Sequence, residues 1–146
     1  MEVNGVGYQV NIPLSSYDRL PAPGAKVRIL THLAIREDAH VLYGFASGAE
    51  RDLFRLLVQS VTGVGPKLAL AVLSGMSVES FKANVVAGDI AAISGISGVG
   101  KKTAERMVVE LKDKVGIASE WEAASTRHAG DSKETTQIHD AVLALI

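Results

Sequence analysis

The first 45 residues alternate between apolar and polar positions with a period of two, which is typical of half-buried β-strands. The alternation runs over residues 3–12 and 26–35, and an apolar run follows at 41–45. The polar residues 36–39 lie between the last two runs and predict a hairpin turn. Several short strands with polar turns between them predict a small antiparallel barrel or sandwich.

From Ser47 onward the apolar residues recur every three or four positions, which indicates amphipathic helices. Ser47 and Glu50 have the spacing of a capping box, in which each side chain bonds the backbone amide of the other at the start of a helix. The same periodicity predicts further helices over 68–73, 77–88, 91–93 and 103–115. We expect Gly116 to end the last helix, because glycine is a common helix stop.

These patterns divide the chain into four segments. Residues 1–46 are predicted to form the strand domain and 47–116 an all-α domain, so the fold class is α+β. Residues 117–136 lose periodicity and are rich in small and polar residues, as expected for a flexible linker. Residues 137–146 are predicted to be the first helix of an incomplete further domain. Because the strand pattern begins almost at Met1, we expect the barrel to lack its first strand.

One short pattern occurs twice in the helical segment, 35 residues apart. The copies are Thr62-Gly-Val-Gly-Pro-Lys-Leu-Ala69 and Ser97-Gly-Val-Gly-Lys-Lys-Thr-Ala104. Repetition at such a spacing is typical of a repeated helical unit. Each copy lies between two apolar periodic runs and therefore predicts a helix, a Gly-Val-Gly turn and a second helix.

The glycines of such a turn can take positive φ and let a ligand approach the backbone closely. The helix that follows presents unpaired N–H groups and about half a positive charge, which can hold a phosphate oxygen. Lys67, Lys101 and Lys102 stand where they could add attraction. An ordinary tight connection that binds nothing is the alternative, but repetition with a cation at matching positions favours a pair of backbone clamps for nucleic acid.

A second phosphate-binding motif overlaps the later copy. The stretch from Gly95 to Lys101 satisfies most of the Walker phosphate loop, but Lys102 stands where that loop has the hydroxyl ligand of magnesium. The preceding segment also lacks the pattern of a buried strand. Both departures argue against nucleotide hydrolysis.

Charge and composition narrow the class of protein. The net charge is −1, but residues 51–116 carry nine Lys and Arg against six Asp and Glu, a local charge of +3. The chain has no cysteine, so it has no disulfide or thiolate metal site. No apolar run approaches the roughly 20 residues that span a bilayer, and the start does not resemble a signal peptide. We therefore expect a cytoplasmic protein.

No residue pattern predicts catalysis. None of the four histidines is spaced as a metal ligand pair, and no triad can be assembled from neighbouring residues. Glu105, Arg106, Glu110 and Lys114 are explained as a solvated helix face with pairs at i, i+4. The sequence therefore predicts no catalytic residue, metal site or cofactor.

Glu37 and Asp38 are adjacent acids at the tip of the predicted hairpin. One interpretation is a solvated turn. The other is electrostatic, because two carboxylates close to a nucleic-acid backbone repel phosphates and could separate strands.

Several motifs together closely resemble the bacterial RuvA family. The resemblance covers residues 3–116 continuously and touches 137–146. It is specific because the motifs agree in order as well as in spacing. The residues that carry it are Asn4-Gly-Val-Gly-Tyr8, Arg36-Glu-Asp38, Leu42-Tyr-Gly-Phe45, Gly63-Val-Gly-Pro-Lys-Leu-Ala-Leu-Ala71 and Gly98-Val-Gly-Lys-Lys-Thr-Ala-Glu-Arg106.

The resemblance implies a subunit that binds Holliday junctions, with an oligonucleotide-binding (OB) β-barrel, two helix-hairpin-helix units and a mobile C-terminal domain. It implies a homotetramer, or an octamer in which a second tetramer covers the junction. It also implies that a RuvB ATPase drives branch migration, using ATP that this chain does not bind, and that RuvC resolves the junction.

The same resemblance assigns roles to individual residues. The clamp amides would be those around Gly63, Val64, Gly65, Gly98, Val99 and Gly100. The nearby cations would be Lys67, Lys101, Lys102 and Arg106. Glu37 and Asp38 would form an acidic pin at the centre of the junction. Compared with the family, this sequence is expected to lack the opening strand, which closes the barrel, and most of the C-terminal domain, which regulates RuvB.

Two other classes of protein remain open on the sequence. A DNA repair nuclease or lyase could use the helix-hairpin-helix units as anchors, but would need a catalytic lysine or carboxylate cluster. A protein-interaction module would bind no DNA at any salt concentration.

Overall fold

The computed structural model describes residues 1–128, and it describes the side chains of residues 1–115. The compact unit that carries the features below comprises Met1–Lys112. The predicted fold class is confirmed, since strands occupy the first part of this unit and helices the remainder. The predicted helix at 137–146 lies outside the described residues, as does the part of the predicted linker beyond 128.

The first strands form a separate small hairpin. β1 (Glu2–Val3) pairs antiparallel with β2 (Val6–Gly7). Asn4 and Gly5 connect them with φ of 52° and 82°. An Asn-Gly pair favours this two-residue turn because both central residues need positive φ. The prediction of one strand-like run over 3–12 was therefore wrong, because it missed the turn chemistry of this dipeptide.

The remaining strands form a three-stranded sheet in the order β3-β5-β4. β3 is Val10–Asn11, β4 is Leu30–Ile35 and β5 is His40–Phe45. The pairing of Ile35 with His40 closes the β4–β5 hairpin around the polar residues 36–39, as predicted. β3 lies parallel to β5, although an antiparallel arrangement was expected. The chain between them is long enough for the crossover that a parallel pair requires.

Six helices are present in the described part of the chain. They are α1 (Leu14–Tyr17), α2 (Gly48–Ser60), α3 (Pro66–Gly75), α4 (Val78–Ala87), α5 (Ile90–Ser94) and α6 (Lys101–His128). The predicted end of the last helix at Gly116 was wrong, because α6 continues through this glycine and over residues 117–128, which were predicted to belong to the linker. An interior glycine costs a helix only about 1 kcal/mol, and the following residues include good helix formers such as Ala118 and Glu120.

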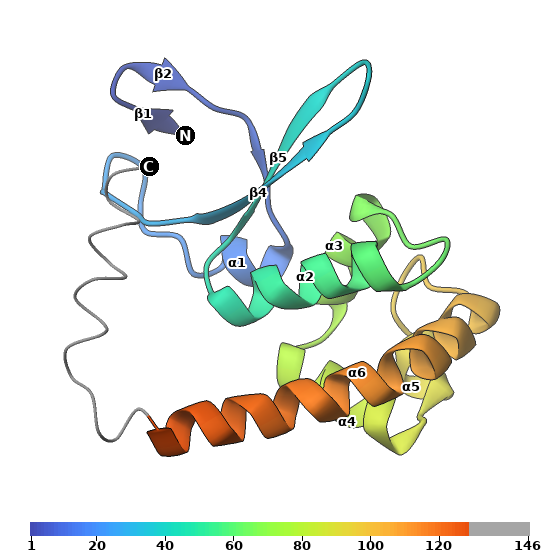
Figure 1. Ribbon diagram of the computed structural model, residues 1–146. Helices are drawn as coiled ribbons and strands as arrows, with labels where there is room; N and C mark the ends of the chain where they lie inside the picture. Colours follow the sequence, from blue (N-terminus) through green and yellow to red (C-terminus); the bar gives the residue numbers. More distant parts are fainter. Residues whose placement is uncertain (129–146) are drawn as a thin grey trace. The chain divides into compact units, whose positions relative to one another are not determined.

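Aromatic rings join the sheet to α2. The ring of Phe54 lies 4.9 Å from that of Phe45 and 5.0 Å from that of Tyr43. Phe45 and Phe54 are fully buried. The β4–β5 hairpin extends away from this cluster of aromatic rings, so its tip points away from the helices (Figure 1).

A second core lies among the helices. Val72, Phe81, Ile93, Met107 and Leu111 are each fully buried and come from α3, α4, α5 and α6. The two copies of the repeated pattern lead into α3 and α6, whose first residues they include. The core therefore fixes the two turns relative to one another.

A buried carboxylate connects the strand segment to the helical segment. Glu50 on α2 is 3% exposed and accepts hydrogen bonds from the hydroxyls of Ser15 at 2.7 Å, Ser16 at 2.9 Å and Ser47 at 3.2 Å. The Ser47 hydroxyl in turn accepts from the Glu50 amide at 3.3 Å, which confirms half of the predicted capping box. The other half was wrong, because the carboxylate bonds hydroxyl groups, two of them from α1.

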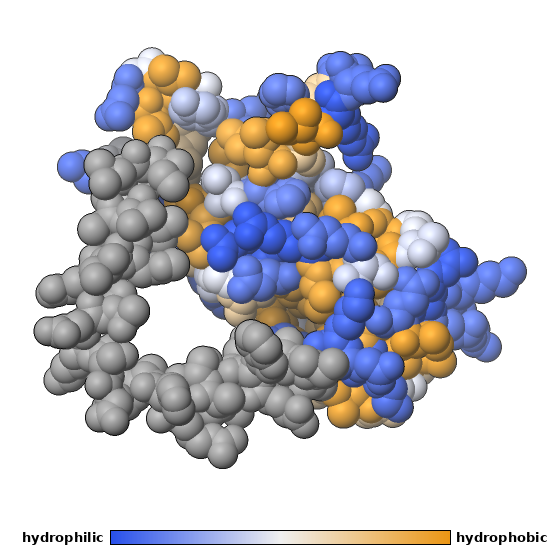
Figure 2. All heavy atoms as spheres, viewed as in Figure 1, coloured by the Kyte–Doolittle hydropathy of each residue, from blue (hydrophilic) through white to orange (hydrophobic). Residues whose placement is uncertain are grey.

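Apolar side chains remain exposed on the strands. Figure 2 shows a hydrophobic surface over this part of the molecule. The exposed apolar residues of the strands include Val3 (49% exposed), Val6 (52%), Leu33 (47%) and Ile35 (68%). The exposed positions alternate along β4, so Leu33 and Ile35 lie on one face of this strand. Such a face is typical of a surface that another protein covers.

Candidate nucleic-acid interface

The two copies of the repeated pattern adopt the same backbone conformation. Gly63 has φ of 83° and Gly98, 35 residues later, has φ of 90°. Both lie in the left-handed region that glycine enters without a steric penalty. The repeat in the sequence therefore corresponds to a repeat in structure.

The residue between the glycines anchors each turn. The Val64 amide donates to the Val61 carbonyl at 3.2 Å, and the Val99 amide donates to the Ile96 carbonyl at 3.0 Å. All four of these side chains are buried. The resemblance placed Val64 and Val99 among the clamp residues. Since their amides and side chains are occupied within the protein, the amides open to a ligand begin at Gly65 and Gly100.

The helix after each turn begins toward solvent. The Ala69 amide bonds the Gly65 carbonyl at 3.0 Å and starts α3, and the Ala104 amide bonds the Gly100 carbonyl at 2.9 Å and starts α6. The amides that precede each of these bonds have no acceptor inside their own helix. At α3 no side chain caps them. Each helix start can therefore bind an anion.

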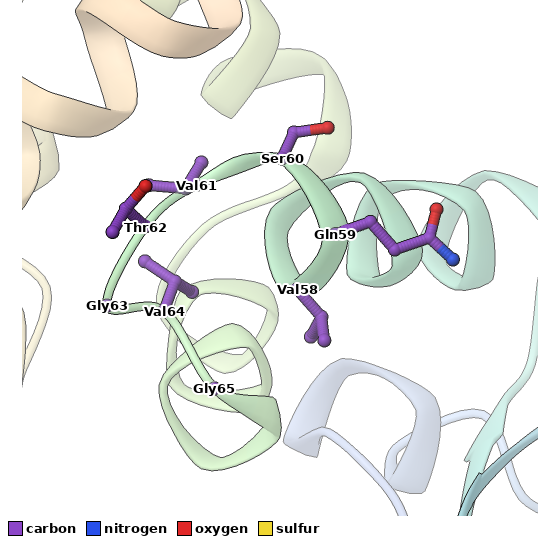
Figure 3. Close-up of a pocket in the computed structure, with 8 residues that line it drawn as sticks. All are labelled: Val58, Gln59, Ser60, Val61, Thr62, Gly63, Val64 and Gly65. Carbon is purple, nitrogen blue, oxygen red and sulfur yellow. The ribbon is translucent and has the colours of Figure 1, made fainter.

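The second glycine of each turn leaves this helix start accessible. A Cβ added to Gly65 or Gly100 would meet no atom within 4 Å, so both positions face open space. At the first turn, the hollow lined by Val58–Gly65 has a volume of about 510 Å³ (Figure 3). The two starts differ in one respect, because Pro66 provides no N–H whereas Lys101 does. The second clamp therefore offers one more backbone donor than the first.

The cations predicted for this interface are all exposed. Lys67 lies in the first turn of α3, and Lys101 and Lys102 lie in the first turn of α6. Exposed ammonium groups beside open amides raise the local positive potential. Their contact with nucleic acid stays a prediction.

Arg106 is also exposed, but it contacts the protein itself. Its Nη1 donates to the Thr62 carbonyl oxygen at 3.0 Å. The Thr62 amide donates to Glu110 Oε2, also at 3.0 Å. The interpretation of Arg106 and Glu110 as a simple solvated face was therefore wrong. Their spacing at i, i+4 was visible in the sequence, but a backbone partner more than 40 residues away was not.

The acidic residues Glu37 and Asp38 lie at the tip of the β4–β5 hairpin, as predicted. The Arg36 amide donates to the Ala39 carbonyl at 2.8 Å and closes the turn beneath them. Both acidic side chains are exposed. They are therefore available to act on a ligand, and their role as a pin stays a prediction.

The His32 side chain contacts other residues of the protein. Arg55 Nε donates to His32 Nδ1 at 3.3 Å, and the His32 ring lies edge-on to Phe54 with centroids 5.5 Å apart. Burial and then the positive charge of Arg55 lower the pKa of His32. The neutral ring thus serves as an acceptor that joins β4 to α2.

Two further searches concern only the described residues. Within residues 1–128 no three of the His, Asp and Glu side chains that can be described gather into a group that could hold a metal ion. In the same part of the chain no helix has the length and apolarity needed to cross a membrane.

The fold and the paired turns define a class of protein: a tandem helix-hairpin-helix protein that carries a small strand domain at its N-terminus. The family model for the SAM-like helix-hairpin-helix tandem matches residues 54–113. The family model for the RuvA N terminal domain matches residues 1–44.

Individual relatives agree with both matches. The Holliday junction branch migration complex subunit RuvA of Opitutus terrae is 47% identical over 147 residues, which cover all of this chain and 74% of that protein. The RuvA subunit of Thioalkalivibrio sulfidiphilus is 48% identical and is covered to 73%. That of Acidithiobacillus ferrooxidans is 53% identical over 116 residues. The chain belongs to the RuvA family.

Proposed function

We propose that this protein binds four-way DNA junctions as a non-catalytic subunit of a branch-migration complex. The observation that carries the proposal is the pair of equivalent glycine turns, each followed by an accessible helix start within one packed core. Such clamps grip phosphates without reading bases, so the path of the backbone decides what binds. The relatives named as junction branch-migration subunits support this reading.

Assembly of several copies completes the proposed function. A local charge of +3 in residues 51–116 gives one subunit little affinity for DNA. Four copies around a junction would multiply the clamps, and binding through several linked sites raises the overall affinity steeply. The exposed apolar face of the strands supports a homotetramer, with an octamer as the larger form on DNA.

Glu37 and Asp38 act as a pin at the centre of this assembly. Their exposed carboxylates at the end of an extended hairpin would repel phosphates and keep the strands apart where arms exchange. The double variant Glu37→Gln with Asp38→Asn should change the migration rate of a junction more than its affinity. An unchanged rate would count against the pin.

The chemical work belongs to partners in this proposal. A RuvB-type ATPase hydrolyses ATP and moves the DNA, and a RuvC-type nuclease resolves the junction, while this chain holds the substrate in the cytoplasm. Incubation of the pure protein with abasic or flapped DNA should leave the DNA intact. Cleavage would contradict the non-catalytic part of the proposal and favour a repair nuclease or lyase.

The test of junction binding is fluorescence anisotropy with a labelled four-way junction and a linear duplex of the same sequence, at matched ionic strength. We expect tighter binding to the junction and affinity that falls as salt rises. Gly65→Asp or Gly100→Asp should weaken binding at least about tenfold, because each places a carboxylate where a phosphate binds. Gly7→Asp is the matched control, since a Cβ there also meets open space. Equal affinity for junction and duplex would refute the proposal.

A further inference from the structure

We infer that Arg106 and Glu110 are positioning residues that hold the first clamp in its binding conformation and couple it to the second. The inference rests on the proposed function for its DNA readout. Both side chains act on one residue, Thr62, and both use its backbone. Arg106 donates to the carbonyl oxygen and Glu110 accepts from the amide N–H, and each donor–acceptor distance is 3.0 Å. Together the two hydrogen bonds fix the orientation of the residue as well as its position.

The location of Thr62 gives these bonds their effect. Thr62 directly precedes Gly63, whose positive φ turns the chain toward the open amides that begin at Gly65. A change in the backbone at Thr62 therefore redirects the start of α3. The Arg106 guanidinium also lies against this turn, since a Cβ added to Gly63 would stand 3.1 Å from Nη1.

The helix that supplies both side chains is the one that begins at the second clamp. α6 starts at Lys101, and positions 106 and 110 lie one turn apart on the same face of it. The bonds to Thr62 consequently connect the second clamp directly to the turn of the first. The spacing between the two phosphate sites then depends on these two side chains as well as on the apolar core.

The internal repeat shows that these two hydrogen bonds are not a general feature of the repeated unit. Thirty-five residues earlier, the positions equivalent to Arg106 and Glu110 are Ala71 and Gly75. Neither has a side chain that can bind the backbone of Ser97, the residue equivalent to Thr62. Of the two clamps, the first therefore has this pair of hydrogen bonds and the second does not. The first is also the clamp in which Pro66 lacks the backbone N–H that Lys101 has at the equivalent position.

Glu110 allows a test in which charge and geometry predict opposite results. A carboxylate near bound phosphates repels them, so on charge alone Glu110→Ala should strengthen DNA binding. Positioning predicts that the same change weakens binding. Glu110→Gln removes the charge equally but keeps a side-chain oxygen that can accept from Thr62.

We would measure junction affinity for the wild type, Glu110→Ala, Glu110→Gln and the control Glu105→Ala, another acid on α6. The expected result is about fivefold weaker binding for Glu110→Ala and near wild-type binding for Glu110→Gln, in proportion to one lost hydrogen bond. Glu105→Ala should bind as tightly as the wild type or more tightly. Equal affinities for the alanine and glutamine variants at Glu110 would overturn the inference.

Amide hydrogen exchange measured by NMR tests the same geometry without DNA. The Thr62 amide should exchange about fivefold faster in Glu110→Ala, and its protection should be retained in Glu110→Gln. If the wild type fails to prefer junctions while exchange changes as expected, the proposed function fails and the positioning role stands. Unchanged exchange at Thr62 in the alanine variant would overturn the positioning role.

Discussion

Glu50 accepts a 2.9 Å hydrogen bond from the hydroxyl of Ser16, a residue 34 positions earlier in the chain. Glu50 is 3% exposed and Ser16 is completely buried. The Ser16 hydroxyl also accepts from the Ala46 amide at 2.9 Å, so it uses its donor and an acceptor in one place. The Ser16 contacts join α1 to the end of β5 and to α2, the first helix of the tandem. They thereby connect the β4–β5 hairpin, which bears Glu37 and Asp38, to the helices that carry the clamps.

Glu50→Ala should reduce the free energy of unfolding by about 2 to 4 kcal/mol, because the change removes charge-assisted hydrogen bonds and leaves a buried hydroxyl without its acceptor. Urea denaturation monitored by circular dichroism measures the effect. Glu79→Ala, an acid in the first turn of α4, provides the control and should change stability by less than about 1 kcal/mol. Equal losses for the two variants would contradict a structural role for the Glu50 contact.

The same carboxylate predicts acid sensitivity. Burial alone would raise the pKa of Glu50, but hydrogen bonds from Ser15 and Ser16, the charge of Arg19 and the Ser47 hydroxyl outweigh it and lower the pKa. A lowered folded-state pKa means that the unfolded chain binds a proton first. Stability is therefore fully present above the ordinary glutamate pKa of about 4.5 and falls as pH drops below it. Melting temperatures from pH 6 to pH 3 should decline less steeply in Glu50→Ala than in the wild type.

His32 predicts a second loss of stability as pH falls, in a higher pH range than the loss that Glu50 causes. Since its folded-state pKa is lowered, the unfolded chain takes up a proton as pH falls through the ordinary histidine pKa of about 6.5, while the folded ring stays neutral. The melting temperature should therefore drop between pH 7.5 and pH 5.5. His32→Gln keeps an acceptor for Arg55 and removes the titration, so this part of the drop should shrink. His40→Gln, at an exposed position on the hairpin, is the matched control. An equal change of the pH profile in both variants would contradict this prediction for His32.

Gly63→Ala and Gly98→Ala should each cost about 1 to 2 kcal/mol of stability, because both positions have positive φ that alanine tolerates poorly. Their local consequences should differ. The new methyl group at position 63 meets Arg106 at 3.1 Å, whereas at position 98 it meets no atom within 4 Å. Faster exchange of the Thr62 amide should accordingly accompany Gly63→Ala alone. The same exchange rate in both variants would show that the guanidinium moves away without disturbing the turn.

The sequence by itself determined the elements whose signals are local. Helical periodicity, the Ser47 cap and the doubled glycine pattern predicted the helices after Ser47 and both turns, because these features depend on residues within a few positions of one another. They did not predict α1, which lies in the segment assigned to strands. The polar residues 36–39 between two apolar runs likewise placed Glu37 and Asp38 at a hairpin tip. Where local signals were weak or missed, the predictions failed. Asn4 and Gly5 split a strand-like run, and α6 continued through Gly116.

Only the tertiary structure decided which distant groups meet. The three serines around Glu50 and the capture of Thr62 by Arg106 and Glu110 bring together residues separated by as many as 48 positions. The pattern of polar and apolar residues along a helix is the same whether a polar side chain faces water or bonds the backbone of another element. Folding the two turns onto one core selects between these outcomes. It also occupies the Val64 and Val99 amides, so that the open amides begin at Gly65 and Gly100.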